Sequence, residues 1–271
     1  MIDVIFKYTF LQNAIIASIL SSIVCGIIGT IIVEKKLVMM SGGIAHTSFG
    51  GIGLGYFLGI EPILGAIFFS VLAALGISQI GRKAKTKSDA LIGIFWSTGM
   101  AFGIFFIGLT PGYPPDMTSY LFGDILTVSK TYLYIMVIVT TLLIFSILAF
   151  FNHIRAYLFD EEFLKVLKIP SVLLESFLFV FIALSIVVLL KVVGIILVIA
   201  LLTIPPAISK FFTYDFKNMI IGSIVIGMFL CIFGLYISYR FNIPSGATII
   251  LLSSFLYFIM VIIKTMKKRF D

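Results

Sequence analysis

The residues best suited to chemistry lie in the stretch MMSGGIAHTSFGGIGLGYFLGI, residues 39–60. This stretch is apolar enough to lie in lipid, yet it contains His46, one of two histidines in the chain. An ionisable ring in a membrane segment is costly to bury and often marks an ion pathway, and a neutral imidazole is a good ligand for several transition metals. His46 is therefore a candidate metal ligand or pathway residue. The alternative is a histidine that is hydrogen-bonded to a neighbouring carbonyl.

The same stretch carries a regular pattern of small side chains. Gly43, Thr47, Gly51, Gly55 and Gly59 recur every four residues, which places them along one face of a helix. Small residues at this spacing allow two membrane helices to approach backbone to backbone. We therefore expect the four glycines to pack this helix against a neighbour, whereas the imidazole needs a separate explanation.

Two carboxylates further along are also candidate cation ligands. The residues PGYPP, 111–115, predict a stiff irregular loop. Asp116 follows this loop and is expected to be solvated by default. Asp124 lies in the short apolar segment LFGDIL, where it could line a vestibule through which cations enter. We keep both residues as candidates for a translocation path.

Motifs that would supply energy or covalent chemistry are missing from the sequence. It contains no G-x-x-x-x-G-K-[ST], H-E-x-x-H, C-x-x-C or G-x-S-x-G pattern. Cys25 and Cys231 each fall in an apolar segment, which favours buried thiols over a pair of soft metal ligands. We therefore expect that the chain is not an enzyme, and that another subunit supplies the energy if the protein pumps.

Membrane helices must position these residues. Of 271 residues, 61% are hydrophobic and 11% charged, and the mean hydropathy is +1.22, whereas soluble domains carry about 25% charged residues. The sequence predicts an all-α integral membrane protein with one transmembrane domain over residues 1–271. Pro205 and Pro206 should break or kink one span, and a re-entrant segment at 172–210 would reduce the count from nine spans to eight. The candidate spans are residues 11–33, 39–59, 62–80, 90–109, 131–151, 172–190, 192–210, 218–238 and 246–264.

The basic residues orient these spans. Most of the 19 lysines and arginines fall in alternate loops, which become the inner loops if the N-terminus lies outside. The net charge of +7 is therefore explained by membrane orientation and contact with anionic lipid headgroups. No nucleic-acid partner is implied.

The longest inner loop contains FDEEFLKVLKIP, residues 159–170. The sequence predicts a short amphipathic helix over 160–168. Asp160, Glu161 and Glu162 favour its N-terminus, and Phe163 and Leu164 offer apolar surface. Such a helix could lie on the membrane surface, but its three acids would be repelled by an anionic leaflet.

The histidine stretch resembles the second-span signature of the permease subunits of zinc/manganese ABC importers. Many of these permeases carry G-D-x-x-x-H, whereas Gly42 stands here at the position of the aspartate. The resemblance therefore leaves the metal preference open. It extends in the family's order through SDALIGIFWSTGMAFGIFFIGL (88–109), DMTSYLFGDILTVS (116–129), FDEEFLKVLKIP (159–170), KVVGIILVIALLTIPPAISKFFT (191–213) and GLYISYRFNIPSGATIIL (234–251).

The resemblance implies a multi-pass permease in a prokaryotic cell membrane, with the fold of type II ABC importers. It implies a homodimer that works with cytoplasmic ATPase subunits and an extracytoplasmic metal-binding protein. Its cargo would be Zn²⁺ or Mn²⁺, or else Fe²⁺, with no permanently bound cofactor. Residues 160–164 would form the helix that docks on the ATPase.

Two other functions remain open at this point. The first is an ABC permease for a siderophore or cobalamin, which would need a wider path with fewer ligands. The second is a secondary transporter or channel driven by a gradient. Such proteins commonly carry inverted repeats and intramembrane carboxylates, and neither is clear in this sequence.

Overall fold

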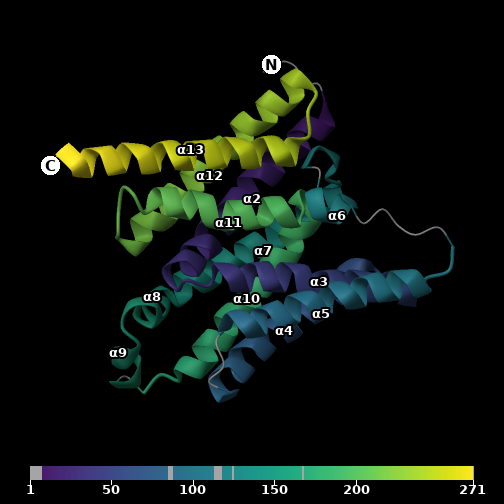
Figure 1. Ribbon diagram of the computed structural model, residues 1–271, viewed down its shortest axis with the longest axis horizontal. Coiled ribbons are helices and arrows are strands. Elements are labelled where there is room, and N and C mark those ends of the chain that lie inside the picture. The colour runs from purple at the N-terminus through teal and green to yellow at the C-terminus, as the bar shows by residue number, and fades with distance from the viewer. Residues whose placement is uncertain (1–7, 85–87, 113–117, 124, 167, 271) are drawn as a thin grey trace. The chain divides into compact units, whose positions relative to one another are not determined.

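The computed structural model describes residues 8–84, 88–112, 118–123, 125–166 and 168–270. Every regular element in these ranges is a helix (Figure 1), so the predicted all-α fold is confirmed. In chain order the elements are α2 (Thr9–Glu34), α3 (Val38–Leu58), α4 (Pro62–Ala84), α5 (Ser88–Leu109), α6 (Thr118–Phe122), the 3₁₀ helix η1 (Ile125–Thr127), α7 (Lys130–Ala149), α8 (Phe151–Phe159), α9 (Glu161–Val166), α10 (Ser171–Val193), α11 (Ile195–Ser209), α12 (Phe216–Phe241) and α13 (Ser245–Phe270).

Seven helices in the described part of the chain are long and apolar enough to cross a membrane: α2, α4, α5, α7, α10, α12 and α13. The other two predicted spans are helices as well. The first is α3, which has 21 residues but is rich in glycine, and the second is α11, which has 15 residues. At about 1.5 Å per residue, α11 covers roughly 22 Å, which is less than a hydrocarbon core of about 30 Å.

The chain divides into two compact units. One comprises Lys35–Met117 and Leu142–Lys191, and in it α3 packs along both α4 and α5, as Figure 1 shows. The other comprises Met1–Glu34, Thr118–Thr141 and Val192–Asp271, and in it α2 packs against α11 and α12. The candidate site residue His46 therefore belongs to the unit that contains α3.

The break in the long apolar run 172–210 lies at Gly194 and not at the prolines. Gly194 has φ 79°, which favours glycine, and it separates α10 from α11. Pro205 and Pro206 lie buried inside α11, which continues to Ser209. Because proline has no N–H, the Leu202 carbonyl has no helical donor from Pro206, and this carbonyl faces Gly29 of α2 at close approach.

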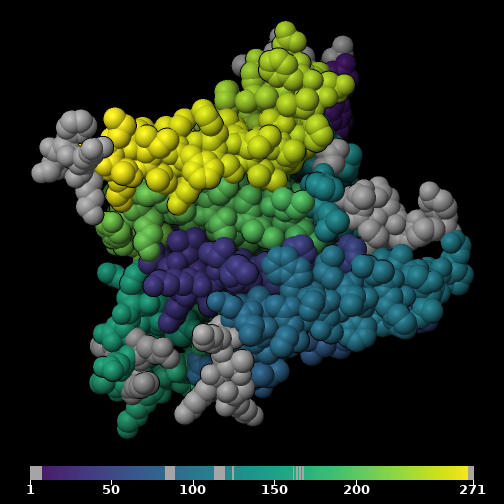
Figure 2. Space-filling model, in the orientation of Figure 1, coloured from purple at the N-terminus to yellow at the C-terminus, as the bar shows by residue number. Residues whose placement is uncertain are grey.

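The helix α13, drawn in yellow in Figure 2, carries large exposed apolar side chains. Leu251, Phe255, Phe258 and Ile262 follow one another at helical spacing and all are exposed. A soluble protein rarely exposes such a contiguous apolar stripe. This face has the character of a surface that is solvated by lipid.

Candidate functional site

His46 lies on α3, and its ring stacks on the indole of Trp96 from α5. The ring centroids are 4.0 Å apart and the ring planes differ by 10°. The imidazole is half-buried, and its Nδ1 atom is buried without a hydrogen-bond partner in the described part of the chain. A buried nitrogen without a partner costs free energy. The alternative explanation, in which the histidine is hydrogen-bonded to a neighbouring carbonyl, is therefore not supported at Nδ1. The stacking contact uses the face of the imidazole ring and not its nitrogen atoms.

A very close contact between α3 and α5 positions this ring. Thr47 Oγ1 lies 2.7 Å from the Gly43 carbonyl oxygen of its own helix and 3.0 Å from the Phe95 carbonyl oxygen of α5. A Cβ atom placed on Gly99 would lie 2.5 Å from Thr47 Cα. The two backbones are therefore as close as glycine permits, and this contact lies next to His46 in the sequence.

The predicted glycine face serves two neighbouring helices. A Cβ on Gly43 would lie 2.6 Å from Ile92 Cγ2 of α5, whereas a Cβ on Gly55 would lie 2.7 Å from Pro62 Cα of α4. Gly51 also meets α4, at Gly65. Four helical residues advance by about 400°, so a four-residue spacing drifts by about 40° per step, which turns the stripe from α5 toward α4.

Gly59 differs from the other three glycines. It ends α3 with φ 67°, and its N–H donates to carbonyls of the last turn. A Cβ on Gly59 would meet nothing within 4 Å. Its role is that of a helix C-cap in the left-handed conformation, and the expectation that it packs against another helix is wrong.

The other candidate cation ligands do not join His46 in the part of the chain that is described. Asp116 and Asp124 both lie outside the described residues. Among the described residues, no group of three or more His, Cys, Asp or Glu side chains could hold a metal. Gly42, which replaces the family's aspartate, lies buried in α3.

The predicted amphipathic helix is present as α9, which is shorter than the expected range 160–168. Asp160 and Glu162 are exposed, whereas Leu164 is fully buried. The side chains of Glu161 and Phe163 lie outside the described part of the structure. Asp160 alone separates α9 from α8, and its N–H donates to the Ala156 carbonyl at 2.8 Å, so the two short helices form a tight turn.

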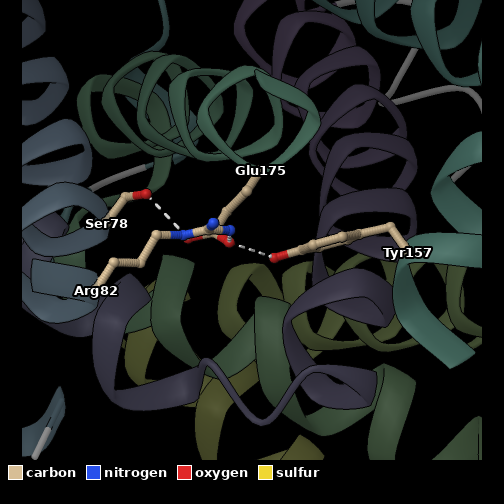
Figure 3. Close-up of polar contacts among 4 residues, drawn as sticks. All are labelled: Ser78, Arg82, Tyr157 and Glu175. Atoms are coloured by element: carbon tan, nitrogen blue, oxygen red, sulfur yellow. Dashed lines mark hydrogen bonds and ion pairs between the residues drawn. The ribbon is translucent and has the colours of Figure 1, made fainter. Parts of the chain in front are cut away.

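A polar cluster that we did not predict joins α4, α8 and α10 (Figure 3). Glu175 of α10 accepts hydrogen bonds from Ser78 (2.9 Å to Oε1) and Tyr157 (3.1 Å to Oε2), and its carboxylate forms an ion pair with Arg82. The sequence did carry a signal for this cluster. Glu175 is the single acid in the apolar stretch 171–193, and Ser78 and Arg82 are four residues apart on one helix face.

Comparisons with known proteins agree with this architecture. The model of the ABC 3 transport family matches residues 7–264. The chain is 44% identical over 253 residues to an uncharacterized membrane protein, slr2045, of Synechocystis, covering 93% of this chain and 90% of that protein. It is 33% identical to the manganese transport system membrane protein MntC of Listeria monocytogenes, with the same coverage.

A solved structure has the same fold. PsaBC from Streptococcus pneumoniae, in complex with Fab, superimposes with a TM-score of 0.86 at 34% identity, covering 96% of this chain and 93% of that one. The family match spans almost the whole chain and includes both α3 with its histidine and the α8–α9 turn. The chain is a multi-pass membrane protein that belongs to the ABC 3 transport family.

Proposed function

We propose that this chain is the membrane-spanning permease subunit of an ATP-driven importer for a divalent transition metal ion, with Mn²⁺ as the cargo. The observation that carries the proposal is the match over nearly the full length to a relative named for manganese transport. The same match argues against the siderophore, cobalamin and gradient-driven alternatives. ATP hydrolysis then belongs to separate ATPase subunits, and the permease itself is not an enzyme.

The geometry around His46 supports a transient cation site in this permease. The Trp96 stack fixes the plane of the imidazole, while Nδ1 has no hydrogen-bond partner among the described residues. A single protein ligand binds a metal weakly, and conduction requires release as well as entry. With Gly42 in place of an acid, His46 is a lone ligand on α3, which favours rapid passage over retention.

Zn²⁺ is the second candidate cargo because of the ligand chemistry. A neutral imidazole suits zinc, whereas manganese prefers carboxylate, carbonyl and water oxygens. The assignment to manganese therefore depends on the relatives rather than on His46. Oxygen ligands for manganese would come from backbone carbonyls, water, or carboxylates such as Asp116 and Asp124.

The partners follow from the same assignment. Residues 160–164 with α9 would dock on a cytoplasmic ATPase, where exposed Asp160 and Glu162 would face the partner and buried Leu164 would hold the turn. An extracytoplasmic metal-binding protein would deliver the ion. A second copy of the permease domain, residues 1–271, would complete the path as a homodimer, and no nucleic acid is involved.

Uptake of radioactive metal by the assembled importer tests this function. We expect wild-type vesicles that contain permease, ATPase and binding protein to accumulate Mn²⁺ only when ATP is present. His46→Ala should remove most of the uptake, with a loss of stability of about 0.5–1.5 kcal/mol from the missing stack on Trp96. His153→Ala is the matched control, because His153 is exposed on α8. Accumulation of Zn²⁺ but not Mn²⁺ would reassign the cargo, and full uptake by His46→Ala would remove His46 from the path.

A further inference from the structure

The Glu175 carboxylate is the meeting point of three helices in one unit. Both of its oxygens accept hydrogen bonds from α4, Oε1 from Ser78 and from Arg82 Nε at 3.3 Å, and Oε2 from Arg82 Nη2, while Oε2 also accepts from Tyr157 of α8. The Glu175 side chain is only 13% exposed. Charge-assisted hydrogen bonds of this kind are about twice as strong as neutral ones, so this carboxylate fixes the relative positions of α4, α8 and α10.

Tyr157 connects this carboxylate to the turn that carries α9. It lies two residues before the end of α8, and α9 begins after the single linking residue Asp160. Tyr157 is 5% exposed and Leu164 of α9 is 0% exposed. One buried side chain thus lies on each side of the exposed turn, and α8 contacts α9. Because a single residue links the two helices, a force on α9 would be passed to α8 and so to Tyr157.

A pocket beside the cluster provides room for such a displacement. Its volume is about 320 Å³, and its lining includes Lys35, Ser78, Arg82, Tyr157 and Glu175. Lys35 Nζ lies 3.9 Å from the centre of the Tyr157 ring on this pocket. Tyr157 therefore lies between a second cation and the carboxylate. A shift of its ring changes the charge environment of Glu175 without breaking a packed apolar core.

We propose that Glu175 is the positioning residue that transmits movement of the docking segment to the membrane helices. Tyr157 would pass the movement from α8 to Glu175, and Arg82 would pass it from Glu175 to α4. The Tyr157 hydroxyl bond couples α8 to α10, and the Arg82 ion pair couples α10 to α4. This inference depends on the proposed function, because it takes residues 160–164 as the segment that the ATPase moves. It assigns a role in coupling to residues that do not contact the transported ion.

The test measures Mn²⁺ uptake and phosphate release in the same vesicles of the full importer and takes their ratio. Tyr157→Phe is the first variant, because it deletes one hydroxyl and keeps the ring over Lys35. Allosteric couplings are typically about 5–150-fold, and we expect the ratio of metal to phosphate to fall by about fivefold or more. ATP hydrolysis and assembly with the ATPase should be retained. Arg155→Gln is the matched control, because Arg155 is exposed on the same helix.

An exchange of the two charges of the ion pair distinguishes a loss of coupling from a loss of folding. Arg82→Glu and Glu175→Arg should each uncouple the importer, and the two together should restore part of the ratio, because the ion pair is rebuilt with reversed ends. A ratio equal to that of wild type in Tyr157→Phe and in Glu175→Gln would overturn the inference. The proposed function fails separately, if the wild-type vesicles accumulate no metal with ATP.

Discussion

Substitution of Gly99 by alanine offers a direct test of the α3–α5 contact that holds His46. The new Cβ would lie 2.5 Å from Thr47 Cα and 3.0 Å from Thr47 Cβ and Cγ2. Carbon atoms prefer separations of about 3.5–4.0 Å, so the helices must separate by roughly 1 Å. No long flexible side chain can move aside, since the nearest atom is backbone. Overpacking of this kind costs about 1–3 kcal/mol.

Gly93→Ala is the matched control on the same helix. Gly93 is exposed, and a Cβ there would meet nothing within 4 Å. Both positions lie inside α5, so the gain in helix propensity of up to about 1 kcal/mol is common to the two variants, and they should differ by the overpacking cost of about 1–3 kcal/mol. Trp96 is the single tryptophan of the chain, and its fluorescence therefore follows unfolding at the contact itself. Gly99→Ala should unfold at a lower temperature than Gly93→Ala and should take up less metal. Equal unfolding temperatures would refute the packing described between Thr47 and Gly99.

Two further predictions concern the ligand position and the docking segment. Gly42→Asp places a carboxylate one helical turn before His46, and we expect tighter Mn²⁺ binding with slower release, measured by equilibrium dialysis and by uptake rate. A variant that is only less stable, with unchanged metal affinity, would contradict a ligand role at this turn. Reversal of both charges at Glu161 and Glu162 should abolish ATP-driven uptake while leaving the permease folded, as judged by thermal unfolding followed through Trp96 fluorescence. Normal uptake in the double reversal would exclude docking through these residues.

The helices were predictable because hydropathy over about 20 residues reports directly on burial in lipid. All nine expected segments are helical, and the predicted division between the spans 172–190 and 192–210 is present close by, at Gly194, whereas Pro205 and Pro206 do not break α11. A tandem proline near the end of a helix removes donors for only two carbonyls, and one of these carbonyls, that of Leu202, packs against a glycine of α2. Tertiary packing thereby tolerates what the local sequence disfavours. The break falls at Gly194, because glycine can adopt the required positive φ.

The candidate site was only partly predictable. His46 stood out because an imidazole is rare in an apolar segment, but its stack on Trp96 depends on the register between two helices, which periodicity does not fix. The glycine spacing predicted close packing, yet it could not show that Gly43 contacts α5 whereas Gly51 and Gly55 contact α4. Glu175 was visible as a lone acid in an apolar run. Its partner Arg82 lies on α4, far away in sequence, and only the fold brings the two together.

Close packing links the Glu175 cluster to His46 within one unit. Arg82 lies near the end of α4, and α4 meets α3 backbone to backbone where Gly65 contacts Gly51. Interfaces packed this closely resist compression and transmit displacement. Movement of α4 at Arg82 should therefore carry α3 and its imidazole with it.

A double-mutant cycle tests this link between the cluster and the α3–α5 contact. If Tyr157→Phe and Gly99→Ala act on one mechanical path, their combined effect on the ratio of metal to phosphate should be smaller than the product of the two single effects. Distant independent sites usually combine additively in free energy, within about 0.3–0.5 kcal/mol. A combined effect equal to that product would show that the cluster and the α3–α5 contact act independently, and α4 would then not be the element that connects them.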